Sequence, residues 1–113
     1  MANVKSIIAD MQTIINSAYQ KVHAGPLPSR PTGHMLAFRN IQGNAQQIHA
    51  ILSQNPNPSR DSRENIEGLF ATMGENVRLY CQKTDATRPV LIAFNNAYTD
   101  WQVLNRQMAA AAR

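Results

Sequence analysis

The 113-residue sequence contains a single cysteine, which excludes an internal disulfide and any zinc site built from several cysteines. It is also poor in charge, because Asp, Glu, Lys and Arg make up only 16% of the residues, against roughly 25% in typical soluble domains. Amides take the place of charge, with 11 Asn and 9 Gln. Hydrophobic residues reach 43%, too many for a disordered chain. We therefore expect one folded domain over residues 1–113.

Long apolar runs are missing as well. No window reaches the roughly 18 uninterrupted apolar residues that a membrane-spanning helix needs. Asp10, Gln12 and Asn16 interrupt the apolar residues at the start of the chain, which therefore does not read as a secretory signal. We expect no membrane partner and a cytoplasmic location. Export by a route without a cleaved signal stays an alternative.

Proline is almost confined to three breaks, at residues 25–33, 55–59 and 84–89. Prolines interrupt helices, so these breaks delimit four segments, each roughly 30 Å long if helical. In every segment the apolar residues recur at intervals of three and four, as in an amphipathic helix. The sequence predicts an all-α protein, an antiparallel four-helix bundle of up-down-up-down topology. The predicted helices cover about 3–24, 33–54, 61–84 and 87–111.

Local signals refine these helices. Asn3 is the expected N-cap of the first, and Asp61, followed by Glu64, is the expected N-cap of the third. Gly43 weakens the second helix by about 1 kcal/mol relative to alanine, unless it lets another helix approach closely. Ile92 and Val103 lie outside the apolar stripe of the fourth helix. That helix is therefore either central in a monomer or available to a partner, and self-association is a further expectation.

No motif indicates a cofactor or a metal. His23, His34 and His49 lack the His-x-x-x-His or Glu-x-x-His spacing that aims two ligands from one helix face. We interpret them as surface or boundary residues. The fourth helix offers no histidine for a haem, and the helical methionines fall on apolar stripes, where methionine usually fills a core. We expect neither a cofactor nor a metal.

Catalytic motifs are missing too. Cys81 lies towards the C-terminal end of the third predicted helix, where the helix dipole disfavours a thiolate, so we interpret it as a small buried residue. Asp100 and Glu75 are single carboxylates, interpreted as solvated or ion-paired rather than as a catalytic pair. The chain has no Gly-rich phosphate loop and no Gly-x-Ser-x-Gly elbow. The sequence predicts a protein that is not an enzyme and has no catalytic residues.

Acidic residues are absent from the 50 positions between Asp10 and Asp61. This stretch holds all three histidines, and the chain carries a net charge of +4. The pattern predicts a basic edge on the second helix and its flanking loops, although its cations are sparse. One hypothesis is therefore a nucleic-acid-binding bundle. It would use Lys21, Arg30, Arg39 and Arg60.

The amides favour a different function. Uncharged polar side chains on the second and fourth helices cost less to desolvate than charges, and charge is depleted at interface centres. The leading hypothesis is a non-catalytic bundle that binds protein, either itself or another chain, in an accessory, adaptor or assembly role. A cofactor- or ligand-binding bundle is less favoured. The predicted partner-binding residues are Leu27, Arg30, Arg39, Gln42, Gln46, Asn95 and Gln102.

Overall fold

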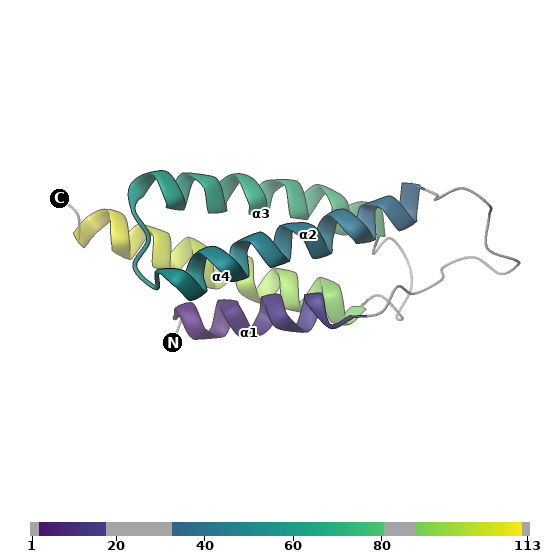
Figure 1. The fold of residues 1–113 in the computed structure, drawn as a ribbon, viewed down its shortest axis with the longest axis horizontal. Helices are drawn as coiled ribbons and strands as arrows, with labels where there is room; N and C mark the ends of the chain where they lie inside the picture. The colour runs from purple at the N-terminus through teal and green to yellow at the C-terminus, as the bar shows by residue number, and fades with distance from the viewer. Residues whose placement is uncertain (1–2, 18–32, 81–87, 112–113) are drawn as a thin grey trace, which may run out of the picture.

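The structure is a computed structural model that describes residues 3–17, 33–80 and 88–111, and these residues form four helices and no strand (Figure 1). The all-α bundle predicted from the sequence is confirmed. The helices are α1 (Val4–Ile15), α2 (Gly33–Gln54), α3 (Arg60–Tyr80) and α4 (Arg88–Ala111). Residues 18–24 and 81–84, predicted as helical, lie outside the described residues.

Helices that follow one another in the sequence also pack side by side. α1 packs against α2 and α4, and α2 packs against α1 and α3. The first turn of α1 and the last turns of α4 therefore lie at the same end of the bundle (Figure 1). The backbones of α3 and α4 approach each other less closely than those of the other neighbouring pairs.

Aromatic rings occupy the wider space between α3 and α4. Phe70 of α3 is fully buried, and its ring lies 5.7 Å from that of Tyr98, 6.1 Å from that of Trp101 and 6.4 Å from that of Phe94, measured between centroids. Gly74 of α3 makes room for this packing, because a Cβ there would lie 3.2 Å from Cζ of Phe94. Large side chains on α4 thus set the spacing of the two helices.

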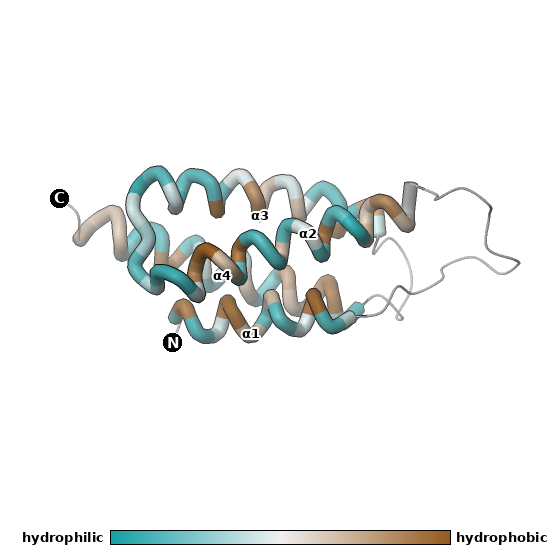
Figure 2. Tube along the Cα trace, viewed as in Figure 1, coloured by the Kyte–Doolittle hydropathy of each residue, from teal (hydrophilic) through white to brown (hydrophobic). Residues whose placement is uncertain are grey.

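Each helix contributes one apolar stripe to the core, and hydrophobic and hydrophilic residues alternate along every helix (Figure 2). Burying one large aliphatic or aromatic side chain contributes roughly 1.5–3 kcal/mol. The core is therefore the main source of stability. Its fully buried large side chains are Ile7, Met11, Ile14, Ile41, Ile48, Leu52, Ile66, Phe70, Met73, Tyr80 and Trp101.

The first helix is shorter than predicted, since it ends at Ile15 rather than near residue 24. Asn16 is the C-cap, and its backbone N–H donates to the carbonyl of Gln12. The Ser17 backbone N–H donates to Ile14 O at 3.1 Å, and its hydroxyl donates to Thr13 O at 2.8 Å. These local polar bonds end the helix although the apolar spacing of the sequence continues past them.

The predicted N-caps have different outcomes. Asn3 caps α1 as predicted, because its Oδ1 accepts from the Ser6 backbone N–H at 2.8 Å. The prediction of Asp61 as a cap is wrong. Ser59 caps α3 instead, and its Oγ accepts from the Ser62 backbone N–H at 3.3 Å. Asp61 lies in the first turn of α3, where a carboxylate interacts favourably with the helix dipole without capping it.

Gly43 is not needed to let another helix approach α2 closely. A Cβ built at this position meets no heavy atom within 4 Å. The residue therefore weakens α2, as the sequence suggested, without a packing reason. Pro89 lies in the first turn of α4, where its missing N–H removes no intrahelical hydrogen bond.

Candidate functional site

The predicted partner-binding residues on α2 and α4 do not form one surface. Arg39 and Gln46 of α2 and Asn95 and Gln102 of α4 are all exposed. However, α2 packs against α1 and α3, whereas α4 packs against α1 and α3 from the other side, so α2 and α4 lie diagonally across the bundle. One partner contacting both pairs would have to reach around the molecule.

Gln42, predicted as a partner contact, is engaged within the chain. Its Nε2 donates to Ser17 O at 2.9 Å and to Ile15 O at 3.1 Å, and Ile14 O lies 3.5 Å away. These are carbonyls that the end of α1 leaves without intrahelical partners. Gln42 therefore ties α1 to α2.

The outer side of the α2–α3 pair carries two exposed leucines beside an amide pair. Leu36 and Leu79 are 47% and 49% exposed. Asn40 Nδ2 of α2 donates to Asn76 Oδ1 of α3 at 3.4 Å, and both leucines lie on the side of this pair towards the start of α2 and the end of α3. Leu36 lies four residues from Asn40, and Leu79 lies three from Asn76, so each leucine shares a helix side with its amide. We call these four residues the α2–α3 face.

A buried amide lies beside this face. Asn44, one turn beyond Asn40 on α2, is only 9% exposed, and its Nδ2 has no hydrogen-bond partner among the residues that the structure describes. An unsatisfied buried donor costs free energy. Buried amides are usually paired, and no sequence pattern predicts the burial of Asn44.

The basic edge is only partly visible. Lys21 and Arg30 lie outside the described residues, as does Leu27. Arg39 lies near the start of α2 and Arg60 at the start of α3, so α2 separates them by roughly 20 Å. Arg60 also pairs with Glu64, at 3.3 Å between Nε and Oε1. The two described arginines therefore do not form one basic patch.

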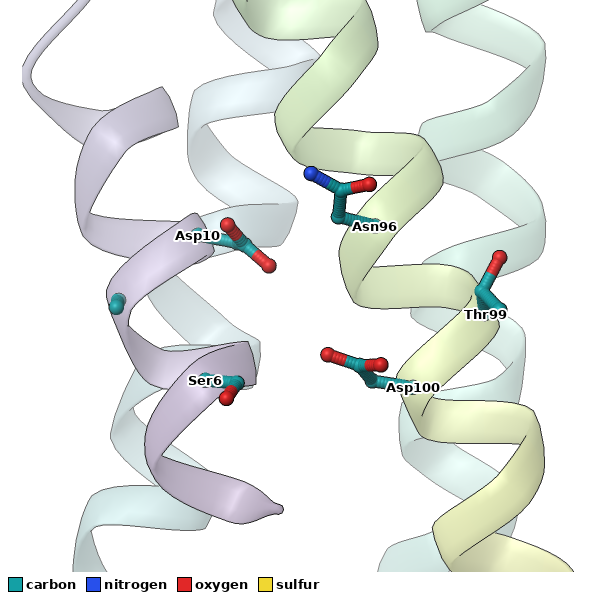
Figure 3. A pocket seen from close by; sticks show the side chains of 6 residues that line it. Ser6, Asp10, Asn96, Thr99 and Asp100 are labelled. Atoms are coloured by element: carbon teal, nitrogen blue, oxygen red, sulfur yellow. The ribbon is translucent and has the colours of Figure 1, made fainter. Parts of the chain in front are cut away.

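Two carboxylates point into the cleft where α1 meets α4. Asp10 of α1 and Asp100 of α4 line a cleft of about 430 Å³ together with Ser6, Asn96 and Thr99 (Figure 3). Burial raises the pKa of Asp10, and the nearby charge of Asp100 raises it further. Neither carboxylate forms an ion pair within the described residues. The sequence predicts Asp100 only as a single carboxylate, and its juxtaposition with Asp10 is not predicted.

The remaining chemistry-bearing residues have ordinary surroundings. Glu75 is ion-paired with Arg78, at 2.8 Å, as the sequence analysis allowed. His49 is half-buried and contacts the Ser53 hydroxyl at 3.3 Å. Cys81 lies outside the described residues. Within the described ranges, no group of three or more His, Cys, Asp or Glu side chains is placed to hold a metal ion.

None of the described helices combines the length and the apolarity that crossing a bilayer requires. No protein family, curated protein or solved structure matches this chain. Its function is therefore argued from the surfaces described above.

Proposed function

We propose that this protein is a non-catalytic helical bundle that acts by binding protein through the α2–α3 face. The observation that carries the proposal is the exposure of Leu36 and Leu79 on neighbouring helices, next to the Asn40–Asn76 amide pair. Isolated exposed leucines are common on protein surfaces. Two of them on adjoining helices, beside an uncharged hydrogen-bonded pair, form a surface whose desolvation costs little free energy.

The energetics of this face suit a protein interface. Full burial of a leucine contributes roughly 1.5–3 kcal/mol, so covering the exposed half of each contributes roughly 1 kcal/mol. Asn76 already accepts from Asn40 and donates to Thr72 O at 2.9 Å. The two amides therefore bring part of their hydrogen bonding with them when water is removed. Interface centres have the same composition, apolar and poor in charge.

The other surfaces support this function less well. The α1–α4 cleft presents two carboxylates, which a partner would have to desolvate together. Arg39, near the start of α2, and Arg60, at the start of α3, are the two described members of the basic edge and lie far apart. Phosphate contacts favour clustered cations over isolated ones.

The test is site-specific photo-crosslinking in the native cells. A photoreactive phenylalanine derivative replaces Leu36 or Leu79 in turn, with Gln102, an exposed residue of α4, as the matched control position. We expect a discrete adduct from both leucine positions and none from Gln102. The mass of the adduct distinguishes a second copy of this chain from another protein, and sedimentation at several concentrations measures self-association independently.

Two results contradict the proposal. The first is no adduct at either leucine, or the same adducts from Gln102. The second is binding of a labelled DNA duplex or single strand that falls steeply with salt and is weakened by Arg39→Glu, because it would return the function to the nucleic-acid hypothesis.

A further inference from the structure

A groove lies at the end of the bundle opposite the α2–α3 face. The last turns of α4 extend past the first residue of α1 (Figure 1), so α1 does not cover them. Leu104, Met108 and Ala111 of α4 line the groove on one side, and Pro58 and Arg63 line it on the other. Its volume is about 440 Å³, within the roughly 300–1,000 Å³ range of ligand pockets. We call it the Arg63 groove.

Arg63 brings a positive charge into a groove whose lining mixes aliphatic side chains with the uncharged polar residues Asn57, Ser59 and Gln107. The residue is half-buried, and its Nη1 donates to Pro58 O at 3.1 Å. It takes part in neither of the two ion pairs found within the described residues, which are Arg60–Glu64 and Arg78–Glu75. The guanidinium therefore has N–H donors left for another acceptor.

The carboxylates near Arg63 on α3 are already engaged. Glu64 pairs with Arg60. Glu67, one turn further along, accepts from Trp101 Nε1 at 3.2 Å and from Asn105 Nδ2 at 3.4 Å. The groove thus combines aliphatic and uncharged polar side chains with a cation that forms no ion pair within the described residues.

The geometry points to a partner protein as the occupant of the Arg63 groove: a segment that presents one carboxylate between aliphatic side chains. This inference rests on the proposed protein-binding function and names the chemistry of one partner segment. The planar guanidinium binds a carboxylate through two parallel hydrogen bonds, and partial burial strengthens the pair. Leu104, Met108 and Pro58 accommodate the aliphatic neighbours, as an interface pocket accommodates an anchor residue.

The test uses the full chain and two synthetic pentapeptides, acetylated and amidated at their ends. The first, Ala-Leu-Glu-Leu-Ala, carries the carboxylate, and the second, Ala-Leu-Gln-Leu-Ala, differs only by its amide. Nuclear magnetic resonance titration follows the backbone signals of Arg63, Leu104 and Met108. We expect the acidic peptide to bind about tenfold or more tightly than its amide counterpart, with an affinity that falls as salt rises.

Two variants distinguish an effect of the Arg63 guanidinium group from an effect of positive charge alone. Arg63→Gln should reduce binding of the acidic peptide to the level of the amide peptide. Arg63→Lys, which keeps the charge but loses the planar fork, should give an intermediate affinity. Arg60→Gln, on the same helix turn but paired with Glu64, is the matched control and should leave binding unchanged. Circular dichroism checks that each variant keeps its helices.

Several results overturn the inference. They are no peptide binding, equal binding of the two peptides, no effect of Arg63→Gln, or tighter binding of octanoate, which would indicate a lipid site. Resonance signals that shift with protein concentration in the absence of peptide would indicate a second copy of the chain in the groove. That result would overturn the inference as well. Leu36 and Leu79 lie at the other end of α2 and α3. If peptide binding is absent while crosslinking from these leucines persists, only the inference about the groove fails. If both are absent, the proposed function fails as well.

Discussion

Asp10 of α1 and Asp100 of α4 point into the same cleft between the two helices, Asp10 at the level of Asn96 and Asp100 at the level of Ser6 (Figure 3). Burial, and then the charge of Asp100, raise the pKa of Asp10. The folded protein therefore holds a proton on Asp10 at pH values where the unfolded chain has lost it. Below the ordinary pKa of aspartate, the raised pKa of Asp10 increases the free energy of unfolding. This contribution disappears as the pH rises through the raised pKa.

Asp10→Asn should consequently stabilise the bundle at neutral pH and have little effect near pH 4. The gain should stay under about 1 kcal/mol, because solvent screens a half-exposed carboxylate pair. Urea unfolding of both proteins at the two pH values measures it. Asp100→Asn should reduce the pH dependence of Asp10 without abolishing it, since burial is the larger cause. An identical difference between wild type and Asp10→Asn at both pH values would show that the pair is not coupled to folding.

Gln42→Ala should destabilise the protein by about 1 kcal/mol, because the variant loses the hydrogen bonds to Ile15 O and Ser17 O. Gln42→Glu should cost more, since a carboxylate repels the negative end of the α1 dipole. Gln46→Ala, an exposed position on the same helix, is the control and should change stability by less than about 0.5 kcal/mol. Equal losses for Gln42→Ala and Gln46→Ala in chemical denaturation would rule out a special role for Gln42.

Two glycines of α3 should respond oppositely to alanine. At Gly68 a Cβ meets no heavy atom within 4 Å, so Gly68→Ala should raise stability by about 0.5–1 kcal/mol through higher helix propensity. At Gly74 the Cβ would lie 3.2 Å from Phe94 Cζ. Gly74→Ala should therefore gain less than Gly68→Ala or lose stability, as the ring has to move. Thermal unfolding of the pair is the measurement, and equal gains at both positions would contradict the packing of Phe94 on α3.

Phe70→Ala should cost about 3–5 kcal/mol, because it leaves a cavity among three aromatic rings of α4. Leu79→Ala, which truncates a half-exposed side chain on the same helix, serves as the comparison and should cost far less. Urea denaturation of both variants provides the values. A loss below about 1 kcal/mol for Phe70→Ala would mean that this ring does not hold α3 and α4 together.

Apolar spacing was sufficient to predict the four helices, because residues such as Ile7, Met11 and Ile14 repeat with the helical period and all become buried. The same rule predicts that the first helix continues to about residue 24, beyond its actual end at Ile15. Its actual end depends on local polar bonds of Asn16 and Ser17 and on Gln42 from another helix. Periodicity reports which side of a helix is buried and contains no information about such bonds.

The surfaces were harder to predict for a related reason. The sequence places Ile92 and Val103 outside the stripe of their own helix but leaves open whether the fourth helix is central or available to a partner; the two residues are 49% and 40% exposed. The register between two helices far apart in the sequence determines that Asp10 and Asp100 line one cleft. Such a register also determines that Arg63 and Leu104 line the same groove. A pattern within one helix does not determine that register.

The aromatic packing between α3 and α4 gives the molecule an optical probe of its own. Trp101 is the sole tryptophan of the chain, it is fully buried against Phe70, and its indole N–H bonds to Glu67. Ultraviolet-excited emission above the tyrosine band therefore originates at one place in the fold. Its wavelength and intensity follow the separation of these two helices without any label being attached.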